Sequence, residues 1–180
     1  MTPLLPLVLS ATDLPLAELH AARLDGEVFA VGAGFSPVDE LEQPRHRAAS
    51  LASANPRLIA EQRTAAWIWG ALASPPIPHE FCSTLDERVA HQNSRWITVR
   101  EVVIESLDLA TMAGRHVTTP LRTCVDLARF SARFGDEERQ IVRFLSASAG
   151  IGMHEFRAHL NRRRNLSHKT AAEERLASCI

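Results

Sequence analysis

Residues 116–129 run His116-Val-Thr-Thr-Pro-Leu-Arg-Thr-Cys-Val-Asp-Leu-Ala-Arg129, a pattern typical of a short strand that leads into a capped helix. Thr119 is a good N-cap because its hydroxyl can accept a hydrogen bond from a first-turn N–H, and Pro120 fits the first helical position. Arg122 and Asp126 share one face of this helix. The apolar stripe on another face, at three- and four-residue spacing, consists of Leu121, Cys124, Val125 and Ala128. We therefore expect a core helix in which Arg122 and Asp126 form a fixed polar brace.

The composition is that of a globular protein. The chain has 180 residues, of which 46% are hydrophobic and 23% charged, enough for one sizeable core or two small ones. No apolar run approaches the roughly 20 residues of a membrane span, and the first residues lack the basic start of a secretory signal. We therefore expect a cytoplasmic protein. Its three cysteines, at positions 82, 124 and 179, include no C-x-x-C pair, which favours reduced, buried thiols over disulfides or structural zinc.

The net charge of −1 conceals a division along the chain. Residues 1–44 carry seven acidic side chains and the single base Arg23, a formal charge of −6, which leaves +5 for residues 45–180. Such asymmetry is one mark of a nucleic-acid-binding surface. Lys169 is the only lysine, so the other 19 bases are arginine, a bias that a GC-rich genome also explains.

The first half of the chain is predicted to begin with a helix over 15–24 and a hairpin over 27–36, in which Gly32 and Gly34 permit a tight turn. A helix followed by a small hairpin indicates a shortened winged-helix segment. Two further helices are expected, over 42–54 and over 56–72, the second starting at Pro56. In it we interpret Trp67 and Trp69 as core anchors.

Strands are predicted over 79–84 and 96–104, in an antiparallel sheet with a bulge near Arg100 and Glu101, where the apolar phase changes. A short turn over 107–112 and a return strand at 116–117 precede the capped helix. Helices over 136–148, 153–161 and 165–180 complete the chain. The expected class is α+β: a winged-helix-like segment, residues 1–40, packed on a mainly helical domain, residues 41–180, with a small antiparallel sheet.

Motifs that carry chemistry are missing from the sequence. It contains no G-x-G-x-x-G, no G-x-x-x-x-G-K-[ST], no G-x-S-x-G and no H-E-x-x-H. His154 lies five residues before His159, and His79 three before Cys82, but neither pair is joined by the further ligands that zinc needs. We therefore expect a protein that is no enzyme and holds no cofactor or metal.

Clustered arginines are the best candidates for binding. The run Arg162, Arg163 and Arg164, with Lys169 close behind, suits phosphate contact because guanidinium groups bind phosphate in a bidentate way and release counterions. A run of arginines at a helix C-terminus can also complement the helix dipole and remain solvated. Phosphate contact and a solvated helix end therefore both stay open as interpretations. Arg45 and Arg47 form a second, smaller cluster directly after the hairpin.

Three segments in order give the chain a family resemblance: residues 26–35 (GEVFAVGAGF), 65–70 (AAWIWG) and 117–129 (VTTPLRTCVDLAR). With these motifs the chain resembles the AbiEi-like antitoxins of actinobacterial type. In that family a winged helix precedes an AAW helix, a small sheet and a TTP-x-RT-x-x-DLAR helix. Trp69 stands where the family usually has histidine, and the winged-helix segment is shortened and acidic. Some relatives add an endonuclease-like C-terminal domain, which we do not expect in a chain of this length.

The resemblance implies a DNA-binding transcriptional regulator that doubles as the antitoxin of a toxin–antitoxin pair. It further implies a partner toxin similar to nucleotidyltransferases, and a homodimer is a further possibility. The residues we expect to contact DNA are Arg45, Arg47, Arg162, Arg163, Arg164 and Lys169. The alternative is a protein-interaction module of the same fold that no longer binds DNA, since a −6 segment is repelled by phosphate.

Overall fold

A computed structural model describes residues 6–85, 94–162 and 164–180. An N-terminal unit contains the helix α1 (Leu16–Leu24) and a hairpin of β1 (Val28–Val31) and β2 (Gly34–Pro37). The body follows with α2 (Pro44–Ala49), β3 (Ile59–Ala60), α3 (Gln62–Ile68), β4 (His79–Thr84), β5 (Ile97–Val102), the 3-10 turn η1 (Ser106–Asp108), β6 (Leu109–Met112) and β7 (Arg115–Thr118). Four helices end the chain: α4 (Pro120–Phe130), α5 (Asp136–Ala149), α6 (Met153–Asn161) and α7 (Lys169–Ala177). The α+β class is confirmed.

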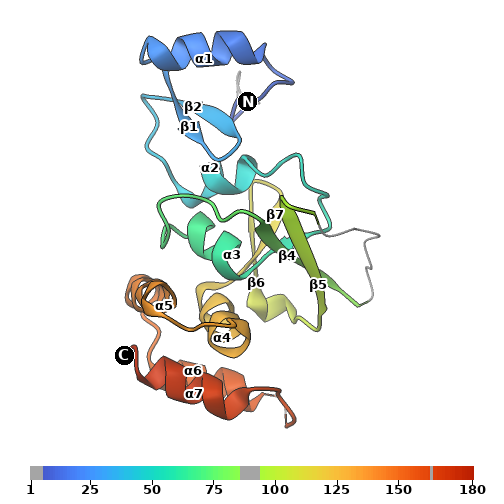
Figure 1. Cartoon of the computed structure of the whole chain (residues 1–180), viewed down its shortest axis with the longest axis vertical. Coiled ribbons are helices and arrows are strands. Elements are labelled where there is room, and N and C mark those ends of the chain that lie inside the picture. Colours follow the sequence, from blue (N-terminus) through green and yellow to red (C-terminus); the bar gives the residue numbers. More distant parts are fainter. Residues whose placement is uncertain (1–5, 86–93, 163) are drawn as a thin grey trace.

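Three parts follow one another along the long axis of the molecule (Figure 1). The hairpin and α1 lie at one end, the five-stranded sheet with α2 and α3 lies in the middle, and α4 to α7 form the other end. Each part has its own apolar cluster. Leu19, Val28 and Phe35 belong to the first, Trp67 and Phe81 to the second, and the helices supply the third. The division into residues 1–40 and 41–180 stays a prediction.

The hairpin is extended by the chain that precedes it. Leu9 and Phe35 exchange backbone hydrogen bonds of 2.7 and 2.9 Å, so residues near Leu9 lie beside β2. Gly34 makes this approach possible, because a Cβ there would lie 2.8 Å from the carbonyl oxygen of Leu9. The hairpin and α1 are therefore present as predicted.

The five-stranded sheet has the order β5-β4-β3-β7-β6 and is mixed. β3 pairs antiparallel with β4 and parallel with β7, and β4 and β5 are also parallel, so the expectation of an antiparallel sheet is wrong for the pairs β3–β7 and β4–β5. Nor does β5 contain the bulge expected at Arg100 and Glu101, because it pairs with β4 in unbroken register from Ile97 to Val102. The apolar alternation is broken instead by a charged residue: Arg100 forms ion pairs with buried acidic side chains.

The helix predicted over 56–72 is in fact a strand and a shorter helix. Ile59 and Ala60 form β3, the central strand, and α3 begins at Gln62. Residues 58–60 are all buried. A short run that is buried on every side has no polar face, so its periodicity cannot distinguish a strand from a helix. The two tryptophans are structural as expected: Trp67 is buried, and the indole N–H of Trp69 donates to the carbonyl of Thr118 at 2.8 Å.

Candidate functional site

The candidate site is built outward from α4. Pro120 opens this helix, and the hydroxyl of Thr119 accepts a hydrogen bond from the backbone N–H of Arg122 at 3.3 Å, as predicted. Because residues four apart lie on one helix face, Arg122 reaches Asp126 one turn later. Its Nε donates to Oδ2 of Asp126 at 2.8 Å. Both side chains are buried, and the expected polar brace is present.

Arg100 brings the sheet to the same carboxylate. From β5 its Nε and Nη2 donate to the two oxygens of Glu61 at 2.5 and 2.7 Å, and Nη2 also lies 3.1 Å from Oδ2 of Asp126. Glu61 precedes α3, so three segments distant in the sequence meet at one buried cluster. Burial opposes the charge of Arg100, but its hydrogen bond to Glu61 and the charges of Glu61 and Asp126 outweigh that cost and raise its pKa.

Asp108 is the second buried carboxylate of the network. Its Oδ2 accepts from Nη1 of Arg122 at 2.8 Å, and its Oδ1 accepts from Nη1 of Arg162 at 3.1 Å. The ring of His159 from α6 lies beside it, with 3.6 Å between Nδ1 and Oδ1 of Asp108, and this Nδ1 has no hydrogen-bond partner in the described part of the chain. Burial lowers the pKa of His159, although the neighbouring charge of Asp108 acts in the opposite direction.

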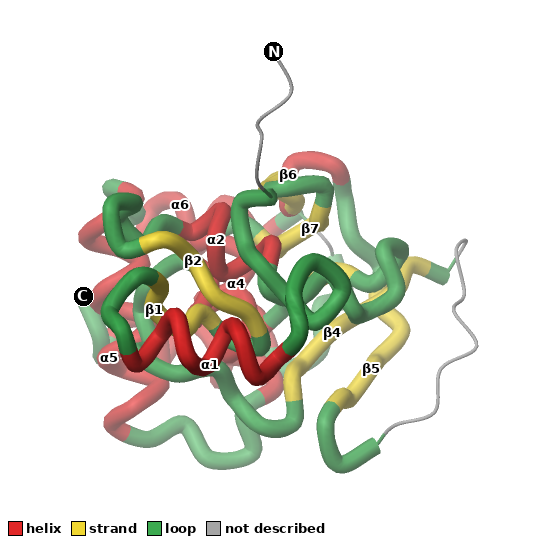
Figure 2. Tube along the Cα trace, turned by 90° about the horizontal axis from the view of Figure 1, so that it is seen from above, coloured by secondary structure: helices red, strands yellow, loops and turns green. Residues whose placement is uncertain are grey.

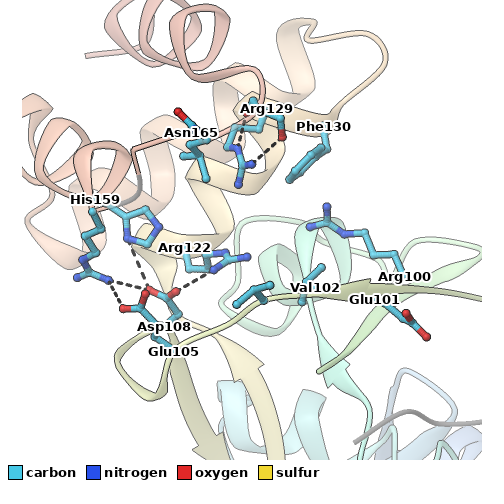
Figure 3. Close-up of a pocket in the computed structure, with 14 residues that line it drawn as sticks. Arg100, Glu101, Val102, Glu105, Asp108, Arg122, Arg129, Phe130, His159 and Asn165 are labelled. Carbon is cyan, nitrogen blue, oxygen red and sulfur yellow. Dashed lines mark hydrogen bonds and ion pairs between the residues drawn. The ribbon is translucent and has the colours of Figure 1, made fainter. Parts of the chain in front are cut away.

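A cleft of about 350 Å³ opens over this network (Figure 3). Its walls include residues of β5, α4 and α6 and of the loop that joins α6 to α7. They are Arg100, Glu101, Val102, Val103, Glu105, Asp108, Arg122, Arg129, Phe130, His159, Arg162, Asn165, Leu166 and Ser167. Phe130 lies at the mouth, 37% exposed, and the guanidinium carbons of Arg100 and Arg129 lie 4.3 and 4.4 Å from the centre of its ring.

Three of the arginines that line the cleft use only part of their donor set in the network. The carboxylates bind Nε and Nη2 of Arg100, Nε and Nη1 of Arg122, and Nη1 of Arg162. No residue that the structure describes accepts from the remaining terminal nitrogen of any of the three. Guanidinium groups that carboxylates fix in position are suited to binding an anion. Phosphate can accept two hydrogen bonds from one guanidinium group.

No cysteine lines the described part of this cleft, in which His159 and Asp108 lie side by side. The nearest thiols belong to the core: Cys82 and Cys124 are buried, and burial raises the pKa of Cys124 to about 12. In the described ranges no cluster of three or more His, Cys, Asp or Glu side chains is arranged to hold a metal ion.

The two predicted basic clusters lie in different parts of the molecule: Arg45 and Arg47 belong to α2 in the middle part, and the second cluster begins after α6 at the C-terminal end (Figure 1). In the first, Arg45 lies 3.6 Å from Glu40, and Arg47 donates to the carbonyls of Trp67 and Leu72 at 2.6 and 2.8 Å. Arg47 thus ties α2 to α3. Whether either residue contacts DNA stays a prediction.

The second cluster borders the cleft. Arg162 lines the cleft, and Arg164 is exposed. Lys169 begins α7, and its Nζ donates to Oδ1 of Asn161, the last residue of α6, at 2.5 Å. Arg163 lies outside the described residues. The structure therefore brings Arg162 of this cluster, but not Arg45 or Arg47, next to the arginines of the network. DNA contact here also stays a prediction.

Several site residues were missed by sequence reasoning. Arg100 lies in an ordinary strand, Arg129 at the end of α4, and Asp108 in a short 3-10 turn. Only the Arg122 and Asp126 pair, two charges on a mostly apolar helix, signals buried partners from elsewhere in the chain. Those partners are set by the pairing of β5 with β4 and by the position of η1, which local sequence does not reveal.

A family comparison identifies the chain. The model of the AbiEi antitoxin C-terminal domain matches residues 58–176, which hold α3, the mixed sheet and α4 to α6. The chain belongs to the AbiEi antitoxin family. Membership supports a role of toxin–antitoxin type. In this AbiEi domain the TTP segment of the resemblance is the cap of α4, and its Arg and Asp are the centre of the buried network.

The fold of this AbiEi protein also occurs in a solved structure. The crystal structure of the RV2827C protein from Mycobacterium tuberculosis matches with a TM-score of 0.52 and 18% identity, over 97% of this chain and 71% of that one. None of the curated proteins compared with the chain matches it. No helix of the described ranges is long and apolar enough to cross a membrane.

Proposed function

We propose that this chain is the antitoxin of a toxin–antitoxin pair and a DNA-binding transcriptional regulator, acting in the cytoplasm by binding and without catalysis. DNA phosphates would contact the basic loop of residues 162–169 and the mouth of the arginine cleft. The partner protein would be a toxin similar to nucleotidyltransferases, as the family resemblance implies.

The observation that carries the DNA proposal is the convergence of arginine donors at one end of the molecule. Arg100, Arg122 and Arg162 each have a terminal nitrogen without a described partner, and Arg129 lines the same cleft. The exposed side chain of Arg164 lies two residues beyond Arg162. Buried carboxylates neutralise much of this charge, so the cleft would position one phosphate, while the loop would supply the salt-dependent attraction.

The N-terminal unit is unsuited to phosphate. Its charged residues are exposed, and seven of eight are acidic. Such a surface repels DNA, and Arg45 and Arg47 have acidic partners in Glu40 and Glu42. The proposal therefore assigns DNA contact to the C-terminal end.

A DNA titration tests the proposal. The full chain is mixed with a fluorescent fragment of its own promoter at about 50 mM salt, where phosphate contacts are strongest. We expect saturable binding that weakens steeply as salt is raised. If the chain binds neither this fragment nor unrelated duplex DNA at about 50 mM salt, the proposal that it is a DNA-binding regulator is wrong.

The acidic unit favours a second candidate, a protein-interaction module of the same fold that has lost DNA binding. A chain that captures the product of the adjacent gene and binds no DNA would support this candidate. A chain that binds DNA, or that stays monomeric and captures no partner, would remove it.

A further inference from the structure

The buried network sets three guanidinium groups in one row. Nη2 of Arg100 and Nε of Arg122 both donate to Oδ2 of Asp126, at 3.1 and 2.8 Å. Nη1 of Arg122 and Nη1 of Arg162 donate to the two oxygens of Asp108, at 2.8 and 3.1 Å. Each neighbouring pair of arginines therefore shares one carboxylate. We call these three residues the arginine row, and all of them line the cleft.

Each member of the arginine row keeps one terminal nitrogen that has no hydrogen-bond partner among the described residues. The three atoms are Nη1 of Arg100, Nη2 of Arg122 and Nη2 of Arg162. The same wall holds Nδ1 of His159, which also has no described hydrogen-bond partner although the side chain is only 8% exposed. Buried polar groups are normally paired, so a cleft wall with several unpaired polar atoms is typical of a binding site.

The number of unpaired donors indicates the kind of anion. The arginine row draws its members from three segments, namely β5, α4 and the end of α6. A carboxylate offers two oxygens in one plane, and the phosphodiester of a nucleic-acid backbone offers two unesterified oxygens. A phosphate monoester offers three acceptor oxygens and carries nearly two negative charges at pH 7. Three donors on three segments therefore match a monoester better than a carboxylate or a diester.

The charge of the wall favours recognition at short range. Four arginines line the cleft together with three acidic residues, Glu101, Glu105 and Asp108, so the wall is nearly balanced in charge. Such a wall selects its ligand by directed hydrogen bonds rather than by long-range attraction. The acidic N-terminal unit lies away from the cleft, because α1 and the hairpin form the opposite end of the molecule (Figure 1). Viewed from that end, α4 and α6 lie behind them (Figure 2).

The size of the cleft suits a small molecule. Its volume of about 350 Å³ lies at the lower end of the range for small-molecule sites, roughly 300 to 1,000 Å³. Apolar side chains complete the wall, among them Val102, Val103, Phe130 and Leu166. We propose that the cleft binds a small molecule whose phosphate group has at least three unesterified oxygens, with that group on the arginine row. An organic phosphate monoester and inorganic phosphate share this chemistry.

Calorimetric titration of the full chain tests the ligand class, with AMP and cyclic 3′,5′-AMP as matched probes at pH 7.5 and constant ionic strength. The probes share base and ribose, but only AMP has a monoester. We expect AMP to bind with a Kd below about 1 mM and the cyclic diester to bind about tenfold more weakly, since it lacks one charged acceptor. Inorganic phosphate separates the two sources. An ion that binds as tightly as AMP is itself the ligand, whereas tighter binding of AMP assigns the cleft to an organic ester.

A pair of variants tests the place of binding. Arg162→Gln removes one donor of the arginine row, at a side chain that is 35% exposed, and we expect AMP to bind about tenfold more weakly. Arg157→Gln is the control. It removes the same charge from α6 at a side chain that is 60% exposed and does not line the cleft, and we expect less than a twofold change. Thermal unfolding without ligand checks that both variants are folded.

The inference is overturned if AMP and the cyclic diester bind the native chain equally, a comparison that needs no variant. It is also overturned if neither AMP nor inorganic phosphate binds at millimolar concentration, or if Arg162→Gln and Arg157→Gln bind AMP equally well. The inference goes beyond the proposed function, because no DNA is present in these titrations. A chain that binds AMP but no DNA would keep the ligand site and lose the regulator, and the reverse result would keep only the regulator.

Discussion

Arg122 and Asp126 are joined across one turn of α4 by a buried hydrogen bond of 2.8 Å between Nε and Oδ2. The same carboxylate receives Nη2 of Arg100 from the sheet, and Nη1 of Arg129 lies 3.6 Å from its other oxygen. One acidic side chain therefore holds three arginines that line the cleft. We therefore expect the charge of Asp126 to matter both for stability and for the arrangement of the site.

Asp126→Asn is expected to destabilise the protein by about 3 kcal/mol, because the buried Arg122 and the partly buried Arg100 and Arg129 lose their shared counter-charge. Chemical denaturation measures the loss. Asp136→Asn is the control, since the side chain of Asp136 is 93% exposed in its pair with Arg139 and should change the free energy of unfolding by less than about 0.5 kcal/mol. Equal losses of unfolding free energy in the two variants would show that the buried network contributes no more to stability than an exposed ion pair.

Arg115 is a second residue at which we expect substitution to destabilise the protein. From β7 its Nη1 donates to the carbonyls of Asn55 and Leu58 at 3.3 Å, and its Nη2 to those of Leu51 and Ala54 at 2.9 Å. An ammonium cannot reproduce this planar fork, so Arg115→Lys should cost about 2 kcal/mol in thermal or chemical unfolding. Arg57→Lys, at an exposed arginine, should be neutral. A stable Arg115→Lys protein would contradict the role given to the fork.

Substitutions at the N-cap of α4 should lower the free energy of unfolding by less than substitutions in the buried network. Thr119→Ala removes the acceptor for the N–H of Arg122 and should lower the free energy of unfolding by about 1 kcal/mol. Thr119→Ser keeps the hydroxyl and should recover most of that loss. If the serine variant is as unstable as the alanine variant, the methyl group rather than the hydrogen bond is responsible.

Local sequence signals predicted the capped helix and the hairpin, because a cap, a proline or a pair of glycines acts within a few residues. The central strand β3 was predicted as helix because Ile59 and Ala60 are surrounded by apolar neighbours and have no polar face. The direction of β5 was missed because pairing with β4 depends on the whole sheet. The cleft could not be predicted for the same reason, since Glu61, Arg100 and Asp108 meet Arg122 only in the folded chain.

Acid should weaken the fold through His159. Burial holds the pKa of His159 below 6.5, so the unfolded chain binds the proton more tightly than the native one. The stability contributed by the neutral ring is complete above about pH 6.5 and is lost as pH falls through the native pKa. Between pH 7.5 and pH 5.5, His159→Gln should lose less stability than the native chain. His154→Gln is the control, because the side chain of His154 is 91% exposed.

The salt dependence of DNA binding tests the central claim most directly. The observable is the slope of log Kobs against log salt for the native chain and for Arg164→Gln/Lys169→Gln, with Arg57→Gln as a control at an exposed base away from the cleft. If Arg164 and Lys169 each contact a phosphate, the double variant should bind more weakly and its slope should be shallower by about 2, while the control matches the native chain. Native and double-variant slopes that coincide would contradict DNA contact at this end of the molecule.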